Sequence, residues 1–135
     1  MQGLAFHHHG LALQNDGDAI VFLASLGYNA GPVVHDRIQD VRLRLCTHRT
    51  MPTVEIVMPG DAPGPLANIL KRHEQLLYHS CYEVSSRERV LAMWEDANLR
   101  LFEVLPPTPA ILFGGRKVSF HTVMGFGLVE LLDSV

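Results

Sequence analysis

The chain repeats one order of motifs in its two halves. Residues 6–13 (Phe-His-His-His-Gly-Leu-Ala-Leu) correspond to residues 77–84 (Leu-Tyr-His-Ser-Cys-Tyr-Glu-Val), and residues 54–57 (Val-Glu-Ile-Val) correspond to residues 129–132 (Val-Glu-Leu-Leu). A repeat whose copies are each too small for a core of their own predicts two modules that share one core. Equivalent residues of the two copies are then expected near a pseudo-twofold axis.

The spacing of apolar residues predicts the elements of each half. In the first half we expect a strand at 4–13, a helix with apolar positions 19, 22, 23 and 26, and strands at 41–46 and 53–58. Asp16 or Asp18 can cap that helix, and Gly27 can end it. In the second half we expect a strand at 77–84, a helix opened by a capping box from Ser85 to Glu88, and strands at 99–104, 117–120 and 127–132.

A proline- and glycine-rich break at 59–65 separates the two halves. We therefore expect a single domain over residues 1–135, with a first module at about 4–59, a connector at 60–76 and a second module at 77–135. A short helix at 66–72 is expected within the connector. The second module has the order strand-helix-strand-strand-strand, and the repeat implies the same order for the first, which places the chain in the α+β class.

Composition excludes several classes of partner. Hydrophobic residues make up 47% of the chain, enough for a sizeable core. A net charge of −3 provides no basic field for nucleic acid. No apolar run reaches the roughly 20 residues that span a bilayer, and we see no secretory signal. Two cysteines are too few for a disulfide framework, and a reducing cytoplasm is the expected location.

A histidine in the first strand and a glutamate in the last occupy matching positions of the two halves. His8 precedes Glu55 by 47 positions, and His79 precedes Glu130 by 51. Each glutamate interrupts an apolar strand, where it faces solvent, pairs with a cationic side chain or binds a metal. Each histidine alone is more typical of an ordinary surface or core residue. The joint arrangement brings a shared metal site close to the plain structural alternatives, because alternation along a strand fixes the face of each residue.

These segments resemble those of methylmalonyl-CoA epimerases and related glyoxalase-like proteins of the vicinal oxygen chelate superfamily. Residues 7–13 resemble the first-strand motif Asp-His-Ile-Gly-Ile-Ala-Val, residues 54–59 resemble Glu-Leu-Leu-x-Pro, and residues 77–84 resemble Ile-His-His-Ile-Ala-Tyr-Glu-Val. Further matches, to a helix ending in Leu-Gly, a Gln-Gly-Val turn and two closing segments, lie at 25–28, 39–41, 114–120 and 127–131. The resemblance covers nearly the whole chain in order.

The resemblance implies two tandem βαβββ modules that form a cup-shaped mixed sheet around one divalent metal ion. By motif position, the metal ligands are His8, Glu55, His79 and Glu130. Imidazole and carboxylate ligands together suit Co, Ni, Zn, Mn or Fe. The resemblance also implies a homodimer.

The resemblance further implies an isomerase, epimerase or lyase that acts on a small carbonyl compound, with an acyl thioester as a candidate substrate. Glu130 or Glu55 is the expected catalytic base, and Glu130 is preferred because an apolar strand makes a carboxylate more basic. Two departures from the epimerases bear on the chemistry. Leu43 lies near a position that can carry an acidic base, and Asp40 stands where glycine is usual.

Three other functions fit the same residues. Glu55, where some epimerases have glutamine, favours an activity like that of lactoylglutathione lyases. His8, His79 and Glu130 alone form the two-histidine, one-carboxylate triad of an iron-dependent ring-cleaving dioxygenase, although Glu55 as a fourth ligand opposes this. A non-enzymatic small-molecule binding, resistance or accessory protein of the same fold is the third.

Overall fold

The computed structural model describes residues 3–135, which form two compact units. The N-terminal unit is His8–Tyr78. The C-terminal unit takes the chain up to His7 and again from His79 to Val135. The division falls inside two strands, so each of them contributes residues to both units. Among the helices of residues 3–135, none has the length and apolar character that a membrane crossing requires.

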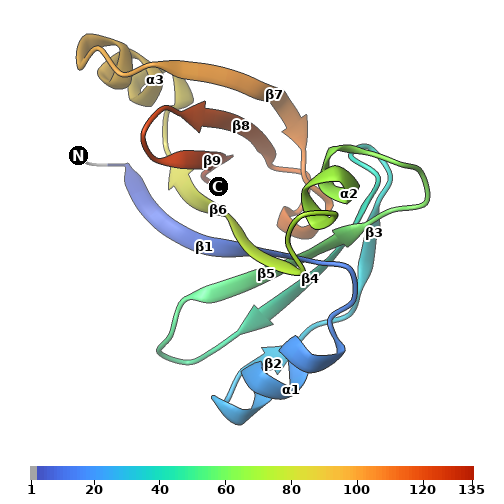
Figure 1. The fold of residues 1–135 in the computed structure, drawn as a ribbon. Coiled ribbons are helices and arrows are strands. Elements are labelled where there is room, and N and C mark those ends of the chain that lie inside the picture. The colour runs from blue at the N-terminus through green and yellow to red at the C-terminus, as the bar shows by residue number, and fades with distance from the viewer. Residues whose placement is uncertain (1–2) are drawn as a thin grey trace. The chain divides into compact units, whose positions relative to one another are not determined.

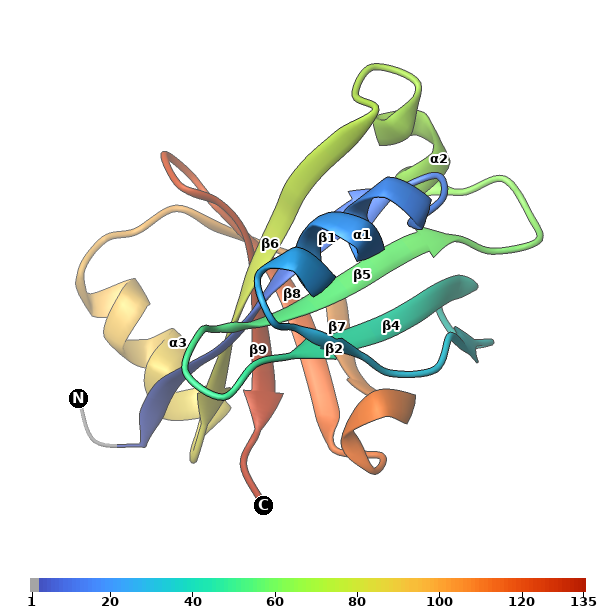
Figure 2. The ribbon, with the colours of Figure 1, turned by 90° about the horizontal axis from the view of Figure 1, so that it is seen from below.

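The N-terminal unit is a mixed sheet with two helices (Figures 1 and 2). Its elements are β1 (Leu4–Leu13), α1 (Gly17–Ser25), β2 (Asn29–Ala30), β3 (Val34–Asp36), β4 (Val41–Thr47), β5 (Thr53–Pro59) and α2 (Pro65–Leu70). Strand β1 is parallel to β5, β5 is antiparallel to β4, and both short strands pair with β4. The core under α1 consists of Leu13, Leu23, Cys46, Ile56 and Met58.

Helix α1 lies where its pattern predicts, but it buries less of its apolar face. Leu23 is buried, whereas Phe22 and Leu26 are exposed. Asp16 occupies the N-cap position, yet its carboxylate does not cap the helix. Instead it accepts a hydrogen bond from Nη1 of Arg44 at 2.9 Å, which ties the start of α1 to β4.

The C-terminal unit repeats the arrangement with one strand fewer, because one long strand takes the place of the two short ones. Its elements are β6 (Gln75–Val84), α3 (Arg87–Asp96), β7 (Leu101–Pro109), a single 3₁₀ turn (Ile111–Phe113), β8 (Lys117–Val123) and β9 (Gly127–Asp133). Strand β6 is parallel to β9, and β8 is antiparallel to both β9 and β7. Val84, Val90, Val129 and Leu131 form the buried core that α3 covers.

The helix cap and the edge strand differ from the expected pattern. Ser86, not Ser85, is the N-cap of α3, and its hydroxyl accepts a hydrogen bond from the Arg89 amide. Strand β7 continues past residue 104 through three prolines as far as Pro109. Because β7 ends the strand order, it has a side with no ladder hydrogen bonds to lose, and proline is tolerated there.

In both units the first strand is parallel to the last, and the last is antiparallel to the strand before it. This shared pairing confirms the predicted α+β fold of two βαβββ modules with a mixed sheet. The first and last strands are also paired in the same register in both units, so residues at matching positions lie on matching strands. The predicted module boundaries at about 4–59 and 77–135 remain predictions.

Candidate functional site

The N-terminal unit brings His8 and Glu55 together on one face of its sheet. Gly10 lies opposite Glu55 in the parallel pairing of β1 and β5, and His8 shares the face of Gly10 because it is two residues away. His8 Nε2 is 3.7 Å from Glu55 Oε1. His8 is 0% exposed and Glu55 only 4%. An imidazole and a carboxylate are therefore buried side by side.

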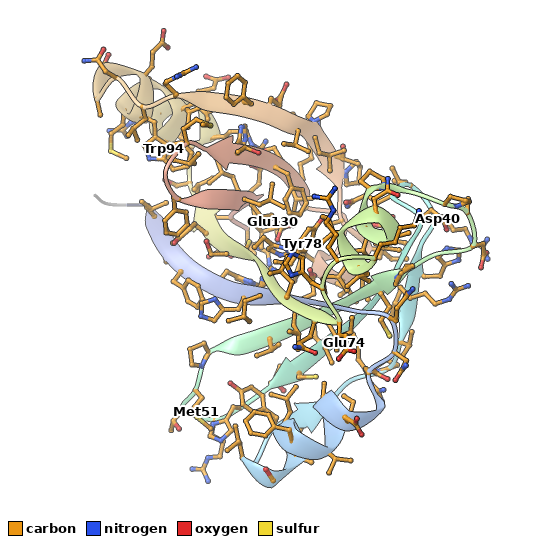
Figure 3. All side chains as sticks on the ribbon, in the orientation of Figure 1. Asp40, Met51, Glu74, Tyr78, Trp94 and Glu130 are labelled. Atoms are coloured by element: carbon orange, nitrogen blue, oxygen red, sulfur yellow. The ribbon has the colours of Figure 1, made fainter. Side chains whose placement is uncertain are left out.

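The C-terminal unit contains the equivalent pair, His79 and Glu130. Cys81 lies opposite Glu130 in the parallel pairing of β6 and β9, and His79 shares the face of Cys81. His79 Nε2 is 3.2 Å from Glu130 Oε1. Both side chains are buried, and the His79 ring lies edge-on to Phe120 with centroids 5.1 Å apart. Figure 3 shows Glu130 among the strands of this unit.

The chemistry of these side chains fits a divalent cation. Two buried carboxylates carry a large desolvation cost when ionised, and a cation compensates that cost. Imidazole nitrogen together with carboxylate oxygen is a donor set that Zn, Mn, Fe, Co and Ni accept. Each unit supplies one donor of each kind from its first and last strands. A half-site of the same composition is thus built twice in the chain.

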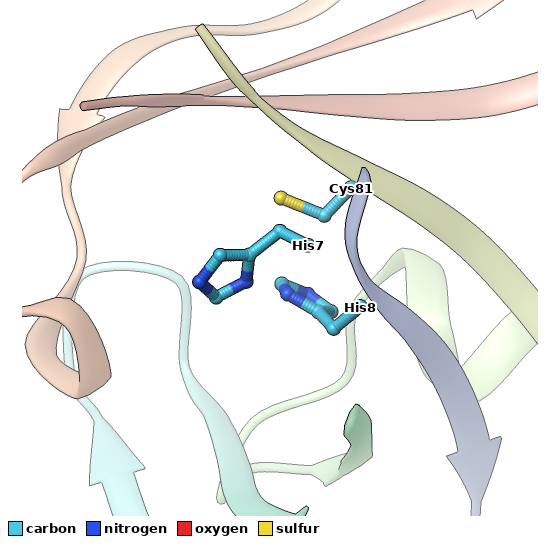
Figure 4. A group of neighbouring side chains, drawn as sticks. All are labelled: His7, His8 and Cys81. Carbon is cyan, nitrogen blue, oxygen red and sulfur yellow. The ribbon is translucent and has the colours of Figure 1, made fainter. Parts of the chain in front are cut away.

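Sequence reasoning missed the group that His7 and Cys81 form in the C-terminal unit. Figure 4 shows these two side chains with the adjacent His8. A ring nitrogen of His7 lies within 4.8 Å of Cys81 Sγ, and the His7 ring packs edge-on against Phe113. Cys81 is buried and lies on the same face as Glu130. Strand alternation places Cys81 on that face, and this pattern could have indicated from the sequence that Cys81 lies near the glutamate.

A second cluster of potential ligands, His35, Asp40 and Asp61, has a structural role in the N-terminal unit. His35 Nε2 is 2.8 Å from Asp40 Oδ1. The backbone amides of Asp61 and Ala62 donate to the Asp40 carboxylate at 3.2 and 2.9 Å, and Arg42 donates to Asp61 at 2.6 Å. These bonds hold the segment after β5 against the turn before β4. Protein donors therefore already serve the Asp40 carboxylate.

The Asp40→Asn substitution should make the free energy of unfolding depend less steeply on pH in acid. The hydrogen bonds from Ala62, His35 and Asp61 lower the Asp40 pKa from 3.8 to about 2. A depressed pKa gives stability that is present above pH 3.8 and lost as the pH falls through about 2. In urea titrations between these pH values, we expect the unfolding free energy to fall less steeply in the variant than in the wild type. Asp96→Asn, on exposed α3, is the control, and a slope equal to the wild type in Asp40→Asn would contradict the assignment.

His121 lies on the opposite face from Glu130. Phe120 is the direct partner of Glu130 across β8 and β9, so the next residue, His121, faces the α3 side. His121 is buried with Nε2 at 2.9 Å from Ser119 Oγ, and burial lowers its pKa. It is therefore a neutral core histidine rather than part of the half-site.

Comparison with protein families gives one match. The sequence model of the Glyoxalase/Bleomycin resistance protein/Dioxygenase superfamily matches residues 7–120. A search of curated proteins finds no match to the chain. The family match includes His8, Glu55 and His79, whereas Glu130 lies beyond its end.

Solved structures share the fold at low sequence identity. Methylmalonyl-CoA epimerase from Mycobacterium tuberculosis superposes with a TM-score of 0.77 at 17% identity, covering 97% of this chain and 88% of that one. A hypothetical protein from Bacillus halodurans C-125 gives 0.78 at 17%, covering 98% and 95%. A methylmalonyl-CoA epimerase variant from Streptomyces coelicolor, in complex with 2-nitronate-propionyl-CoA, gives 0.77 at 15%, covering 99% of each chain. The predicted glyoxalase-like fold is confirmed.

Proposed function

The chain belongs to the Glyoxalase/Bleomycin resistance protein/Dioxygenase superfamily, and from this membership we propose that it is a metal-dependent epimerase, isomerase or lyase. Its reaction is the removal of a proton from the carbon next to a carbonyl group. An acyl thioester is the favoured substrate, because methylmalonyl-CoA epimerases are among the similar folds and one is in complex with a CoA compound. The observation that carries the proposal is the buried His–Glu pair present in both units.

In this proposal one divalent ion is held by His8, Glu55, His79 and Glu130. Support comes from the equivalence of the two pairs: each has its histidine on the first strand, its glutamate on the last, and both side chains buried. Equivalence also favours four ligands over the three of an iron-dependent dioxygenase. A triad would use only one of two glutamates that the repeat treats alike.

The bound ion supplies Lewis-acid stabilisation of the negative charge that develops on a substrate carbonyl oxygen. The chain supplies the base and the dry surroundings. Glu130 is enclosed by Cys81, Phe120 and Leu132 on its own face, and these side chains exclude water. A carboxylate in apolar surroundings accepts a proton more readily, so we assign Glu130 as the base. Glu55 is the second candidate.

Leu43 supports a ligand carboxylate as the base. It lies opposite Val57 in the pairing of β4 and β5 and therefore shares the face of Glu55, where it is buried. By resemblance, this is near the position where an epimerase can carry an acidic side chain. A leucine there has no proton to exchange. The task then falls to Glu130 or Glu55.

Two measurements test the proposal. Elemental analysis of protein purified without chelators or metal-affinity resin should find one divalent metal ion per chain. The metal-loaded protein is then incubated with candidate acyl thioesters in D₂O. Mass spectrometry should detect deuterium at the carbon next to the carbonyl group of the thioester. Bound metal without exchange of any acyl thioester or hemithioacetal would overturn the reaction and favour a binding protein. Protein that takes up no metal would overturn the site itself.

A further inference from the structure

The N-terminal unit contains a cleft on the α1 side of its sheet, away from the face of His8 and Glu55. It lies where the end of β1, the start of α1 and the segment between α2 and β6 meet, an arrangement visible in Figure 2. Leu13 lines it and belongs to the core under α1, whereas Gly10 and Ala12 face the other way with Glu55. The cleft is therefore separate from the proposed metal ligands.

The size and floor of the cleft suit a small organic molecule. Its volume is about 570 Å³, inside the range of roughly 300–1,000 Å³ typical of small-molecule sites. Leu13 and Leu70 are buried residues that line it, and Leu11 and Ala19 add half-buried apolar surface. This apolar floor can cover the hydrocarbon part of a ligand.

The polar lining of the cleft is acidic and amide-bearing. Asp18 from the first turn of α1 and Glu74 from the segment before β6 supply carboxylates, and Glu74 is labelled in Figure 3. Gln14 and Gln75 supply side-chain carbonyl oxygens that accept hydrogen bonds. Within residues 3–135, no lysine, arginine or histidine lines the cleft, and neither carboxylate has an ion-pair partner. The local charge is therefore negative.

We propose that this cleft binds a small organic cation, an ammonium or guanidinium group carried on an apolar body. The carboxylates of Asp18 and Glu74 attract the charged end, the amide oxygens of Gln14 and Gln75 accept its N–H groups, and the leucine floor covers the hydrocarbon. An anion of the same size meets like charge and is disfavoured. This inference stands apart from the proposed reaction and does not depend on the metal.

Binding of benzylamine tests the proposal, with benzyl alcohol as the neutral match and benzoate as the anion. In ¹⁵N-labelled full-length protein, benzylamine should shift the amide signals of the cleft residues and bind more tightly than benzyl alcohol. Asp18 and Glu74 are exposed, so the isosteric substitutions Asp18→Asn and Glu74→Gln should each weaken the binding of benzylamine by about two- to fivefold, the effect of one exposed charge pair. They should leave benzyl alcohol unchanged. Added salt should weaken the binding of benzylamine but not the binding of benzyl alcohol.

Two control variants locate the effect. Asp96→Asn removes another exposed carboxylate, from α3 outside the cleft, and should leave benzylamine binding unchanged. His79→Ala removes a proposed metal ligand and should also leave benzylamine binding unchanged. That result would show that the cleft binds its ligand independently of the proposed reaction. The proposal is overturned if benzyl alcohol binds as tightly as benzylamine. It is equally overturned if the Asp18 and Glu74 variants bind benzylamine like the wild type, or if the shifted signals map elsewhere.

Discussion

We expect the His79→Ala variant to bind the proposed divalent ion more than about 100-fold more weakly than the wild type, since loss of even an outer-shell partner costs roughly 10- to 100-fold. His79 Nε2 is 3.2 Å from the Glu130 carboxylate in a buried environment. Without the imidazole the metal site has one ligand fewer, and water does not easily replace that ligand because the site is buried. Because His8 has the equivalent position in the other unit, His8→Ala is expected to have an effect of similar size.

Metal content by elemental analysis and affinity by titration calorimetry measure this loss. His73→Ala is the matched control, because it removes one imidazole from an exposed position between α2 and β6. A metal that binds the native state raises the unfolding temperature, and that increase should vanish in His79→Ala but persist in His73→Ala. The four-ligand site fails if His79→Ala retains stoichiometric metal with unchanged affinity.

Strand alternation is a strong local pattern and gave the faces of the His and Glu side chains, whereas the fold and the ligand set were implied by the resemblance to glyoxalase-like proteins. On its own face of β1, His8 lies between Phe6 and Gly10, and Glu130 interrupts the apolar run of β9. Each position fixes the face of its side chain once the strand is recognised. The repeat then supplied the correspondence that neither half shows alone.

Short and irregular elements could not be predicted in the same way. Strands β2 and β3 have two and three residues, too few for an alternation to be recognised. The prolines of β7 suggest the end of a strand, and only its place at the end of the strand order makes them acceptable. Ser85 and Ser86 are both suitable caps in the sequence, and backbone geometry selects Ser86.

Asp40 illustrates a departure that only the structure explains. Its φ of 50° lies in the left-handed region, where glycine is the least strained residue. Aspartate tolerates that region better than most side chains, and here its carboxylate binds the Asp61 and Ala62 amides. Aspartate in place of the glycine that is usual in the similar epimerases therefore adds a contact between two loops. It does not contact His8 or Glu55 of the same unit.

Glu130→Gln will lower the rate of proton exchange by roughly 10²- to 10⁴-fold, the usual contribution of a positioned general base. Glutamine has nearly the same shape but cannot accept the substrate proton. Glu55→Gln is the matched variant, because it changes the equivalent residue of the other half. If Glu130 is the base, Glu55→Gln should reduce the rate far less when both are measured at saturating metal.

The pH profile separates a base from a ligand that merely holds the ion. Loss of the base removes the rise of kcat/KM with pH that its deprotonation produces, whereas a weakened ligand lowers the whole profile and keeps its shape. The two proposed histidine ligands release the metal in acid in every variant, so we expect Glu130→Gln to lose only the additional rise that deprotonation of the base produces. Glu55→Gln should keep that rise, in exchange rates measured in D₂O at several pH values. The reverse result would assign the base to Glu55. Retention of that rise in both variants would rule out either glutamate as the base.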